Sequence, residues 1–285
     1  MGWPVFNWFH RDYWAKLTLS AVINIEIMPN YRCLYAVLMC CLLCSLPLLA
    51  APKQEVLLLT YHFKAPYIVD ANQQQGLYFD LANYLNRYSK QFSFRTEFMP
   101  RRRIDAMLQQ SFAHVVVGVQ PVWFKHLGTR VKFTQGVLQE NDIFVSLAAS
   151  PFVSNNLDNL VGKTFIGVQG YRYVGLEQAE KNSILIRVDT MHEDNVLDML
   201  RLGRGDFTVI SQSTLQYKVS HGENPTLYYV AEKPHEHIIR RLMYSSEDTQ
   251  LGTELNRIIT QMKNDPAWLG VLEKYNLDPS FIPPA

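Results

Sequence analysis

The chain has 285 residues, of which 48% are hydrophobic and 19% charged, and its formal net charge is +1. This length accommodates one large two-lobed domain or two ordinary ones. Near-average apolar and charged fractions exclude a disordered chain and a protein with many membrane spans. The balanced charge leaves no basic excess to hold a phosphate backbone, so we expect no nucleic-acid partner.

Residues 33–51 form a charge-free apolar run, "CLYAVLMCCLLCSLPLLAA". Its length lies between that of a signal-peptide core and that of a short membrane span. Arg32 gives it a basic entry, Pro47 breaks the helix near its end, and the small residues Ala50 and Ala51 flank the expected cleavage site. Leu48 is an imperfect match to the small residue expected three positions before the cut. The pattern favours a cleaved signal over a retained membrane anchor, and both export the rest of the chain.

The first 27 residues fit neither a signal sequence nor a folded domain. Met28 is followed by "PNYRCLYAV", which is a more ordinary signal-peptide start. We therefore interpret residues 1–27 as an upstream extension and 28–50 as the signal peptide, which places the mature chain in the periplasm.

The cysteines agree with export, because all of them lie in the apolar run: Cys33, Cys40, Cys41 and Cys44. The remaining chain has no cysteine for a disulfide, a thiolate nucleophile or a cysteine-based zinc site. No motif for a bound cofactor is present, and we expect neither a cofactor nor a metal.

The first half of the mature chain alternates strand and helix patterns. Residues 55–61, 93–99 and 114–120 are short and largely apolar, as in strands that are buried on both faces. Residues 77–88 and 101–110 have helical periodicity between them. Strands that alternate with helices predict a parallel sheet with helices packed on it.

A second unit with the same organisation begins at about residue 156. Residues 163–169, 184–189 and 206–211 have strand patterns, and 192–203 has a helix pattern. The sequence thus predicts an α/β protein with two similar lobes.

Two strand-like connectors, 141–150 and 228–245, join these units. Two helices with apolar faces end the chain, and Asp265 followed by Pro266 marks the start of the second. We assign 51–144 and 236–285 to lobe 1, and 145–235 to lobe 2. Two lobes on two connectors form a hinge whose crevice is a natural ligand site. Ligands bind open α/β sheets beyond the carboxyl ends of the strands, so residues just after the strands are the candidates for binding.

The order of several segments resembles the bacterial extracellular solute-binding proteins of family 3, typified by periplasmic receptors for polar amino acids. The resemblance covers about residues 55–275. It depends on the order and spacing of "GLYFDLANYLNRY", "HVVVGVQ", "LVGKTFIGVQG", "VLDMLRLGRGDFTVI" and "LNRIITQMKNDPAWLGVLEKY". It implies a two-lobed periplasmic-binding-protein-like fold of type II, whose lobes close on a small-molecule ligand for delivery to an ABC transporter.

The resemblance implies ligand contacts after the strands of lobe 1. Tyr61 and Tyr67 follow the first strand and offer flat faces with hydroxyl groups. Gln120 and Trp123 follow the third strand. Lys125 stands where the family places an arginine that grips the ligand carboxylate, and lysine keeps the charge but loses the planar fork.

Basic residues nearby extend this candidate site. Arg130 is an alternative to Lys125 if the loop is rebuilt, although both are also compatible with solvated surface charges. Arg101 and Arg103 open a helix, where basic residues oppose the helix dipole, so an anionic ligand group would compensate them. Pairing with a neighbouring carboxylate such as Asp105 is the structural alternative.

In lobe 2, Gln169 and Arg172 match ligand-contacting positions of the family, and Tyr171 lies between them. Backbone N–H groups at this strand-to-helix turn suit an anion. Ser211, followed by Gln212, stands where the family has the aspartate that binds the ligand's amino group. A serine does not neutralise an ammonium, so the resemblance predicts a small polar, anionic ligand rather than an ordinary amino acid.

We expect a non-catalytic, monomeric receptor that works with an inner-membrane permease or sensor. A sensory binding subunit is one alternative. The other is a periplasmic dehydratase-like lyase on the same fold, for which His62, His126 and Glu140 are the nearby candidates for acid or base. The "HEH" run at 235–237 offers two imidazoles without a third ligand, which is a weak metal signal.

Overall fold

The computed structural model describes residues 52–110, 114–153 and 157–284. The proposed extension, signal peptide and cleavage site lie outside these residues. Residues 52–285 form one compact unit. Among the described residues, every helix is too short or too polar to cross a lipid bilayer.

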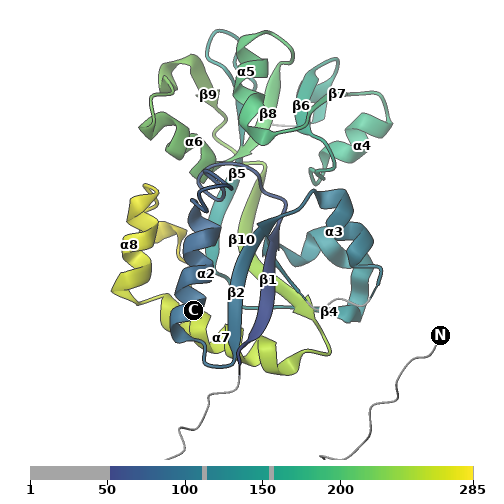
Figure 1. Cartoon of the computed structure of the whole chain (residues 1–285). Coiled ribbons are helices and arrows are strands. Elements are labelled where there is room, and N and C mark those ends of the chain that lie inside the picture. Colours follow the sequence, from purple (N-terminus) through teal and green to yellow (C-terminus); the bar gives the residue numbers. More distant parts are fainter. Residues whose placement is uncertain (1–51, 111–113, 154–156, 285) are drawn as a thin grey trace, which may run out of the picture. The chain divides into compact units, whose positions relative to one another are not determined.

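Lobe 1 is built on a parallel sheet in which β1 lies between β2 and β3. Figure 1 shows β1 beside β2. Residues of β1 alternate between two cores: Val56 and Leu58 face the cluster that includes α2, and Leu59 faces the one that includes α3. This is why the apolar run is nearly continuous, as a strand covered on both faces requires. The elements are β1 Gln54–Thr60, α2 Leu77–Tyr88, β2 Phe92–Phe98, α3 Arg101–Met107, β3 Val115–Val119 and β4 Val131–Phe133.

Lobe 2 repeats the arrangement, with β6 between β7 and β8 in parallel (Figure 1). Phe207 and Val209 of β8 pack into one core and Ile210 into another, so this sheet too is covered on both faces. The elements are β6 Thr164–Val168, α4 Leu176–Lys181, β7 Ile186–Thr190, α5 Val196–Arg201, β8 Phe207–Ser211, α6 Gln212–Ser220 and β9 Tyr228–Val230.

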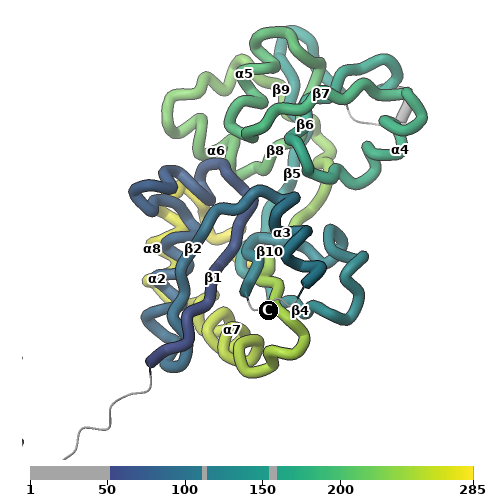
Figure 2. Tube along the Cα trace, turned by 45° about the vertical axis from the view of Figure 1, so that its right-hand side comes forward, coloured from purple at the N-terminus to yellow at the C-terminus, as the bar shows by residue number. Residues whose placement is uncertain are grey.

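Two long antiparallel strands run from one sheet into the other (Figures 1 and 2): β5 Leu138–Leu147 and β10 Glu236–Ser245. They pair with each other from Glu236↔Asp142 to Arg240↔Leu138. Beyond this stretch β10 joins β3 and β4, and β5 joins β8 and β9. A two-strand crossing of this kind can bend without breaking either core, so it is the natural hinge.

The chain ends with helices that complete the core of lobe 1, α7 Thr249–Met262 and α8 Pro266–Lys274. The Asp265 carboxylate caps α8 by accepting the Ala267 N–H at 2.9 Å, and Pro266 occupies the first helical position, as the sequence predicted. The hydroxyl groups of Tyr84 and Tyr88 on α2 also donate to Asp265. These donors lower the pKa of the Asp265 carboxyl.

One predicted element differs in detail, and one loop has local helical structure. The helix expected over 192–203 is a 3₁₀ turn at Glu193–Asn195 followed by the short α5. The loop after β3, Pro121–Arg130, consists of 3₁₀ turns separated by kinks at Phe124 and Gly128, where the backbone leaves helical geometry. Both segments lie beside the cleft, where side-chain contacts rather than helical periodicity determine the backbone.

Candidate functional site

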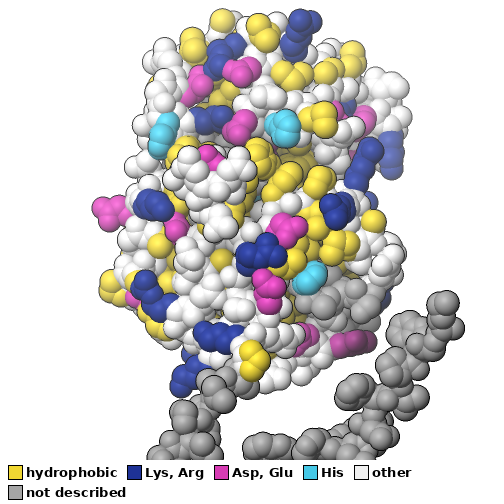
Figure 3. All heavy atoms as spheres, viewed as in Figure 1, with side chains coloured by type: hydrophobic (Ala, Val, Ile, Leu, Met, Phe, Trp, Pro, Cys, Tyr) yellow, Lys and Arg dark blue, Asp and Glu magenta, His cyan; other side chains and the backbone are white. Residues whose placement is uncertain are grey.

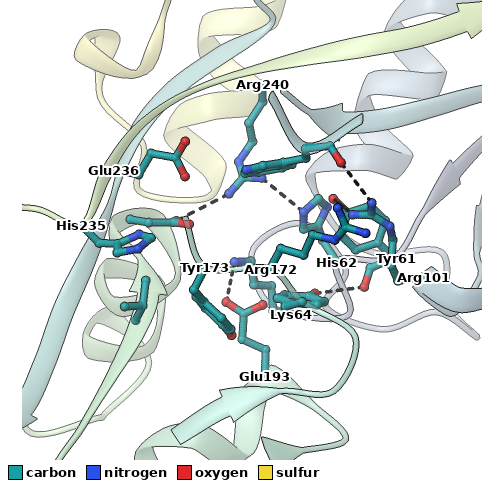
Figure 4. Close-up of a pocket in the computed structure, with 14 residues that line it drawn as sticks. Tyr61, His62, Lys64, Arg101, Arg172, Tyr173, Glu193, His235, Glu236 and Arg240 are labelled. Atoms are coloured by element: carbon teal, nitrogen blue, oxygen red, sulfur yellow. Dashed lines mark hydrogen bonds and ion pairs between the residues drawn. The ribbon is translucent and has the colours of Figure 1, made fainter. Parts of the chain in front are cut away.

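The two sheets meet around a cavity at the carboxyl ends of their strands (Figure 4). Its volume is about 40 Å³, which holds only a few water-sized molecules in this closed geometry. Both lobes and both crossing strands contribute to its lining: Tyr61, His62, Lys64, Arg101, Trp123, Asp142, Tyr171, Arg172, Tyr173, Glu193, Val209, His235, Glu236 and Arg240.

One buried ion pair joins the lobes directly. Lys64, in the loop after β1, places its Nζ 2.5 Å from Glu193 Oε1 and 2.7 Å from Ser211 Oγ of lobe 2. The side chains of Lys64 and Glu193 are each only 4% exposed. Burial raises the pKa of the Glu193 carboxyl, while Lys64 opposes this rise. A buried charge is costly unless it is paired, so this contact holds the closed geometry together.

A second buried network lies at the crossing of β5 and β10. Arg240 Nε donates to Glu140 Oε1 at 2.5 Å and to the Tyr67 hydroxyl at 2.9 Å. The Tyr67 hydroxyl also donates to Glu140, and the Ser213 N–H at the start of α6 donates to Glu140 Oε2 at 3.2 Å. Burial would raise the pKa of Glu140, but the Arg240 guanidinium holds it below its ordinary value. The network therefore fastens a loop of lobe 1, the hinge and a helix of lobe 2 together.

Arg240 has further partners around the cavity. Its Nη1 donates to the Gly118 carbonyl at 3.0 Å, and its Nη2 donates to Ser211 Oγ at 2.9 Å. The Ser211 hydroxyl in turn donates to Asp142 Oδ1 at 2.8 Å. Arg240 is 2% exposed and fully engaged, so it shapes the site rather than offering a free charge.

His62 is a buried imidazole at the cavity wall (Figure 4). It is 3% exposed, and its Nε2 lies 3.4 Å from Arg240 Nη1. Burial lowers the pKa of His62 well below its ordinary value, and the charges of Arg240, Lys64 and Arg101 lower it further. The imidazole is therefore neutral at physiological pH.

Arg101 faces the cleft from the first turn of α3. Its Nε pairs with Asp105 Oδ1 at 2.9 Å, and its guanidinium stacks on the rings of Tyr61 and Phe124 at 4.9 and 4.2 Å. The carboxylate pairing considered from the sequence is thus present. Arg101 also lines the cavity, but its charge is already paired with Asp105.

The turn after β6 carries Tyr171 and Arg172. Arg187 of β7 holds this turn, since its Nη2 donates to the carbonyls of Val168 and Tyr171, each at 3.1 Å. The Tyr171 hydroxyl donates across the cleft to the Tyr61 carbonyl at 3.1 Å. Arg172 is exposed at the cavity, and among the described residues it has no hydrogen-bond or ion-pair partner.

A neighbouring cavity of about 180 Å³, here called the outer chamber, shares Tyr61, Arg101, Tyr171 and Glu193 with the inner one. Its apolar lining comes from both lobes: Phe63, Phe98, Pro100, Val168 and Met191. In Figure 3 hydrophobic side chains gather at the level where the two sheets meet, with basic side chains at their margin. The cleft therefore combines a charged interior with a more apolar mouth.

The residues predicted from the sequence occupy several different places. Those that line the inner cavity are Tyr61, Arg101, Trp123, Tyr171 and Arg172. Gln169 lines the outer chamber, and Ser211 is buried against Lys64. Tyr67 and Gln120 contact the hinge strands instead.

Three predicted residues lie away from the cavity. Arg103 and Lys125 are exposed and line neither chamber. Gln212 lines two hollows beside β5, where it accepts a hydrogen bond from Asn141 at 3.4 Å. Arg130, the alternative to Lys125, is exposed and donates to the Leu108 carbonyl at 3.3 Å.

Sequence reasoning missed most of the charged lining, namely Lys64, Asp142, Glu193, Glu236 and Arg240. A signal was present for Asp142, Glu236 and Arg240, because charged residues inside strand-like connectors are unusual unless they are paired or face a cleft. Of the "HEH" run, His235 lines the cavity, and His237 contacts Asn141 at 3.2 Å. The described residues contain no group of three metal-binding side chains.

Searches with protein-family models and among curated proteins find no match to this chain. Solved structures do match. A mutant of ArgBP from T. maritima is 19% identical and has a TM-score of 0.63, with 78% of this chain and 95% of that chain covered. A periplasmic binding protein from Salmonella typhimurium, described for its high arginine specificity, is 16% identical with a TM-score of 0.61; 78% and 99% are covered.

A third structure is an ancestral amino acid-binding protein described as a precursor of cyclohexadienyl dehydratase. It is 18% identical, has a TM-score of 0.59, and covers 78% of this chain and 95% of its own. Identities this low establish the fold alone. The chain has the two-lobed α/β fold of periplasmic binding proteins, as predicted.

Proposed function

We propose that this chain is an exported solute-binding protein of family 3 that closes on a small polar solute and delivers it to a transporter. The observation that carries the proposal is the cleft itself. Both lobes supply polar side chains to one cavity, and the two strands that form the hinge pass its wall. The amino acid-binding proteins of the same fold support the same role.

We further propose that the solute carries an anionic group. Of the four cations that line the cavity, Lys64, Arg101 and Arg240 are already paired with carboxylates, namely Glu193, Asp105 and Glu140. The sequence had suggested no matching carboxylate, so fewer cations are free than expected. Arg172 is the lining cation without a partner among the described residues. An arginine fork suits a carboxylate or phosphate group.

A thermal-shift screen against amino acids, organic acids, sugars and peptides tests this function, because a ligand that binds the folded state raises Tm by mass action. We expect small organic anions to give the largest shifts. A best ligand that is a cationic amino acid such as lysine would contradict the anionic preference. Absence of any stabilising solute would contradict the receptor function.

Small-angle scattering tests hinge closure. The radius of gyration of the mature chain should be smaller with saturating ligand than without it, because the lobes rotate about β5 and β10. An unchanged radius, with binding established by calorimetry, would exclude this mechanism. A monomer is expected at all protein concentrations.

A lyase is the second candidate function. Neutral His62 lines the cavity, and its Nε2 accepts from Arg240 Nη1, so the imidazole proton is on Nδ1. This N–H has no partner among the described residues and can donate to a reacting group. Glu140 is engaged with Arg240, and exposed His126 lines neither chamber, so neither serves as its partner. Product analysis with each ligand from the screen distinguishes the two functions, since a receptor returns its ligand unchanged.

A further inference from the structure

The ammonium group of Lys64 occupies a position in the cleft that the amino group of a bound solute could take. Its side chain reaches from a loop of lobe 1 across the cleft, and its ammonium makes short bonds to Glu193 and Ser211 of lobe 2. Figure 4 shows the Lys64 nitrogen beside the Glu193 carboxylate. The ammonium lies 5.6 Å from the centre of the Tyr67 ring. Two acceptors and an aromatic ring are what an ammonium group requires when it leaves water.

Glu193 provides an independent sign that this end of the cleft is a binding site. It lines both chambers, and its Oε1 accepts the Lys64 ammonium. Its Oε2 is buried and has no hydrogen-bond partner among the described residues. Buried carboxylate oxygens are normally satisfied, so an unpaired oxygen on a residue that lines both chambers has capacity for a further donor.

We propose that Lys64 is a tethered ammonium that fills an amine-binding end of the cleft and thereby determines specificity. While Lys64 occupies this end, the solute brings no ammonium of its own, and the contact shifts part of the solute-free population toward the closed state. The proposal refines the proposed function, because it states which solutes the cleft rejects.

Chemical rescue tests the tethered ammonium. Lys64→Ala removes three methylene groups and the ammonium, and propylammonium contains the same atoms. About 100 mM propylammonium should raise the Tm of Lys64→Ala by about 3–5 °C, because it binds the folded state only. It should also bind this variant in calorimetry. Propan-1-ol at equal concentration controls for the size of the added molecule, and sodium chloride controls for ionic strength.

The parent and Lys274→Ala are matched controls. Lys274 pairs with Asp80 at 2.8 Å on the surface, where its side chain is 57% exposed, so its removal opens no cavity. Neither protein should respond to propylammonium more than to sodium chloride. Equal responses of Lys64→Ala to the amine and to the controls would overturn the proposal. No solute is involved, so this result is independent of whether the screen finds a ligand.

A second variant avoids the risk that Lys64→Ala does not fold. Glu193→Gln keeps Lys64 and replaces the carboxylate with an amide of the same size, which weakens the contact between the lobes. Without solute, Glu193→Gln should therefore have a larger radius of gyration than the parent. An equal radius would contradict the closing contact.

Discussion

Two arginines of the cleft show opposite ways of placing a charge. Arg240, on the hinge strand, is 2% exposed and contacts Glu140, Tyr67 and Ser211. Arg172, on the turn after β6, is exposed and has no partner among the described residues. A charge removed from water needs partners, and a charge left in water does not. The comparison separates a residue that maintains the structure from one that is available to a solute.

The largest expected effect comes from breaking the buried ion pair between Arg240 and Glu140 at the hinge. Glu140→Ala leaves the Arg240 guanidinium buried without its nearest carboxylate and should lower the free energy of unfolding by about 3–5 kcal/mol. Urea denaturation measures the loss. The exposed pair of Glu55 and Arg95 is the control, since Glu55→Ala should cost at most about 1 kcal/mol. Similar losses in both variants would contradict the role assigned to the hinge network.

Removing the free arginine should affect binding and leave stability unchanged. Arg172→Ala should weaken binding of the solute found by the screen by about 2–3 kcal/mol, or roughly thirty- to hundred-and-fifty-fold, through lost charge-assisted bonds. Its free energy of unfolding should stay within about 0.5 kcal/mol of the parent. Calorimetry compares it with Arg103→Ala, which removes an exposed arginine outside both chambers. Unaltered affinity in Arg172→Ala would refute the assignment.

The pH dependence of stability extends the comparison to a titratable group. His62 has a folded-state pKa well below its ordinary value of 6.5, because burial and the nearby cations disfavour its charged form. The unfolded chain therefore takes up a proton that the folded chain does not as the pH falls below about 6.5. Neutral His62 therefore stabilises the folded state above about pH 6.5, and this stabilisation is lost as the pH falls toward the folded-state pKa of His62.

This loss should amount to about 1 kcal/mol between about pH 7 and pH 5.5. His62→Gln should remove that part of the pH dependence, whereas His126→Gln, which alters an exposed histidine, should retain it. Denaturation curves at both pH values provide the measurement. If the free energy of unfolding falls by the same amount in His62→Gln and in the parent between these pH values, the lowered pKa of His62 is contradicted. Glu140 contributes a loss of the same sign, but only below about pH 4.5.

An effect of about the same size is expected from the residue that positions Arg172. Arg187→Lys keeps the charge but loses the planar fork that holds the carbonyls of Val168 and Tyr171. Affinity for the solute should fall by about 1 kcal/mol, or roughly fivefold. Calorimetry of Arg172→Ala with and without Arg187→Lys gives the check. Without Arg172, the second substitution should have little further effect, and full additivity would contradict a positioning role.

The sequence by itself determined the architecture. Short apolar runs with intervening helical periodicity specified two parallel sheets, because a strand covered on both faces has to be apolar throughout. The sequence also predicted the start of α8, because an aspartate followed by a proline, here Asp265 and Pro266, favours the first turn of a helix. The position of residues after buried strands also placed Tyr61, Tyr171 and Arg172 at the cleft, since parallel strands end at one edge of a sheet.

Only the tertiary structure decided which charges are paired. Lys64 and Glu193 are 129 positions apart in the chain, and Arg240 and Glu140 are 100 apart. No local periodicity encodes such pairs, because they form only when the lobes and the hinge strands come together. The same folding turned Tyr67 toward the hinge and left Lys125 on the surface. Sequence position brings a side chain to the edge of a sheet, whereas long-range packing determines whether its charge is satisfied there or remains free for a ligand.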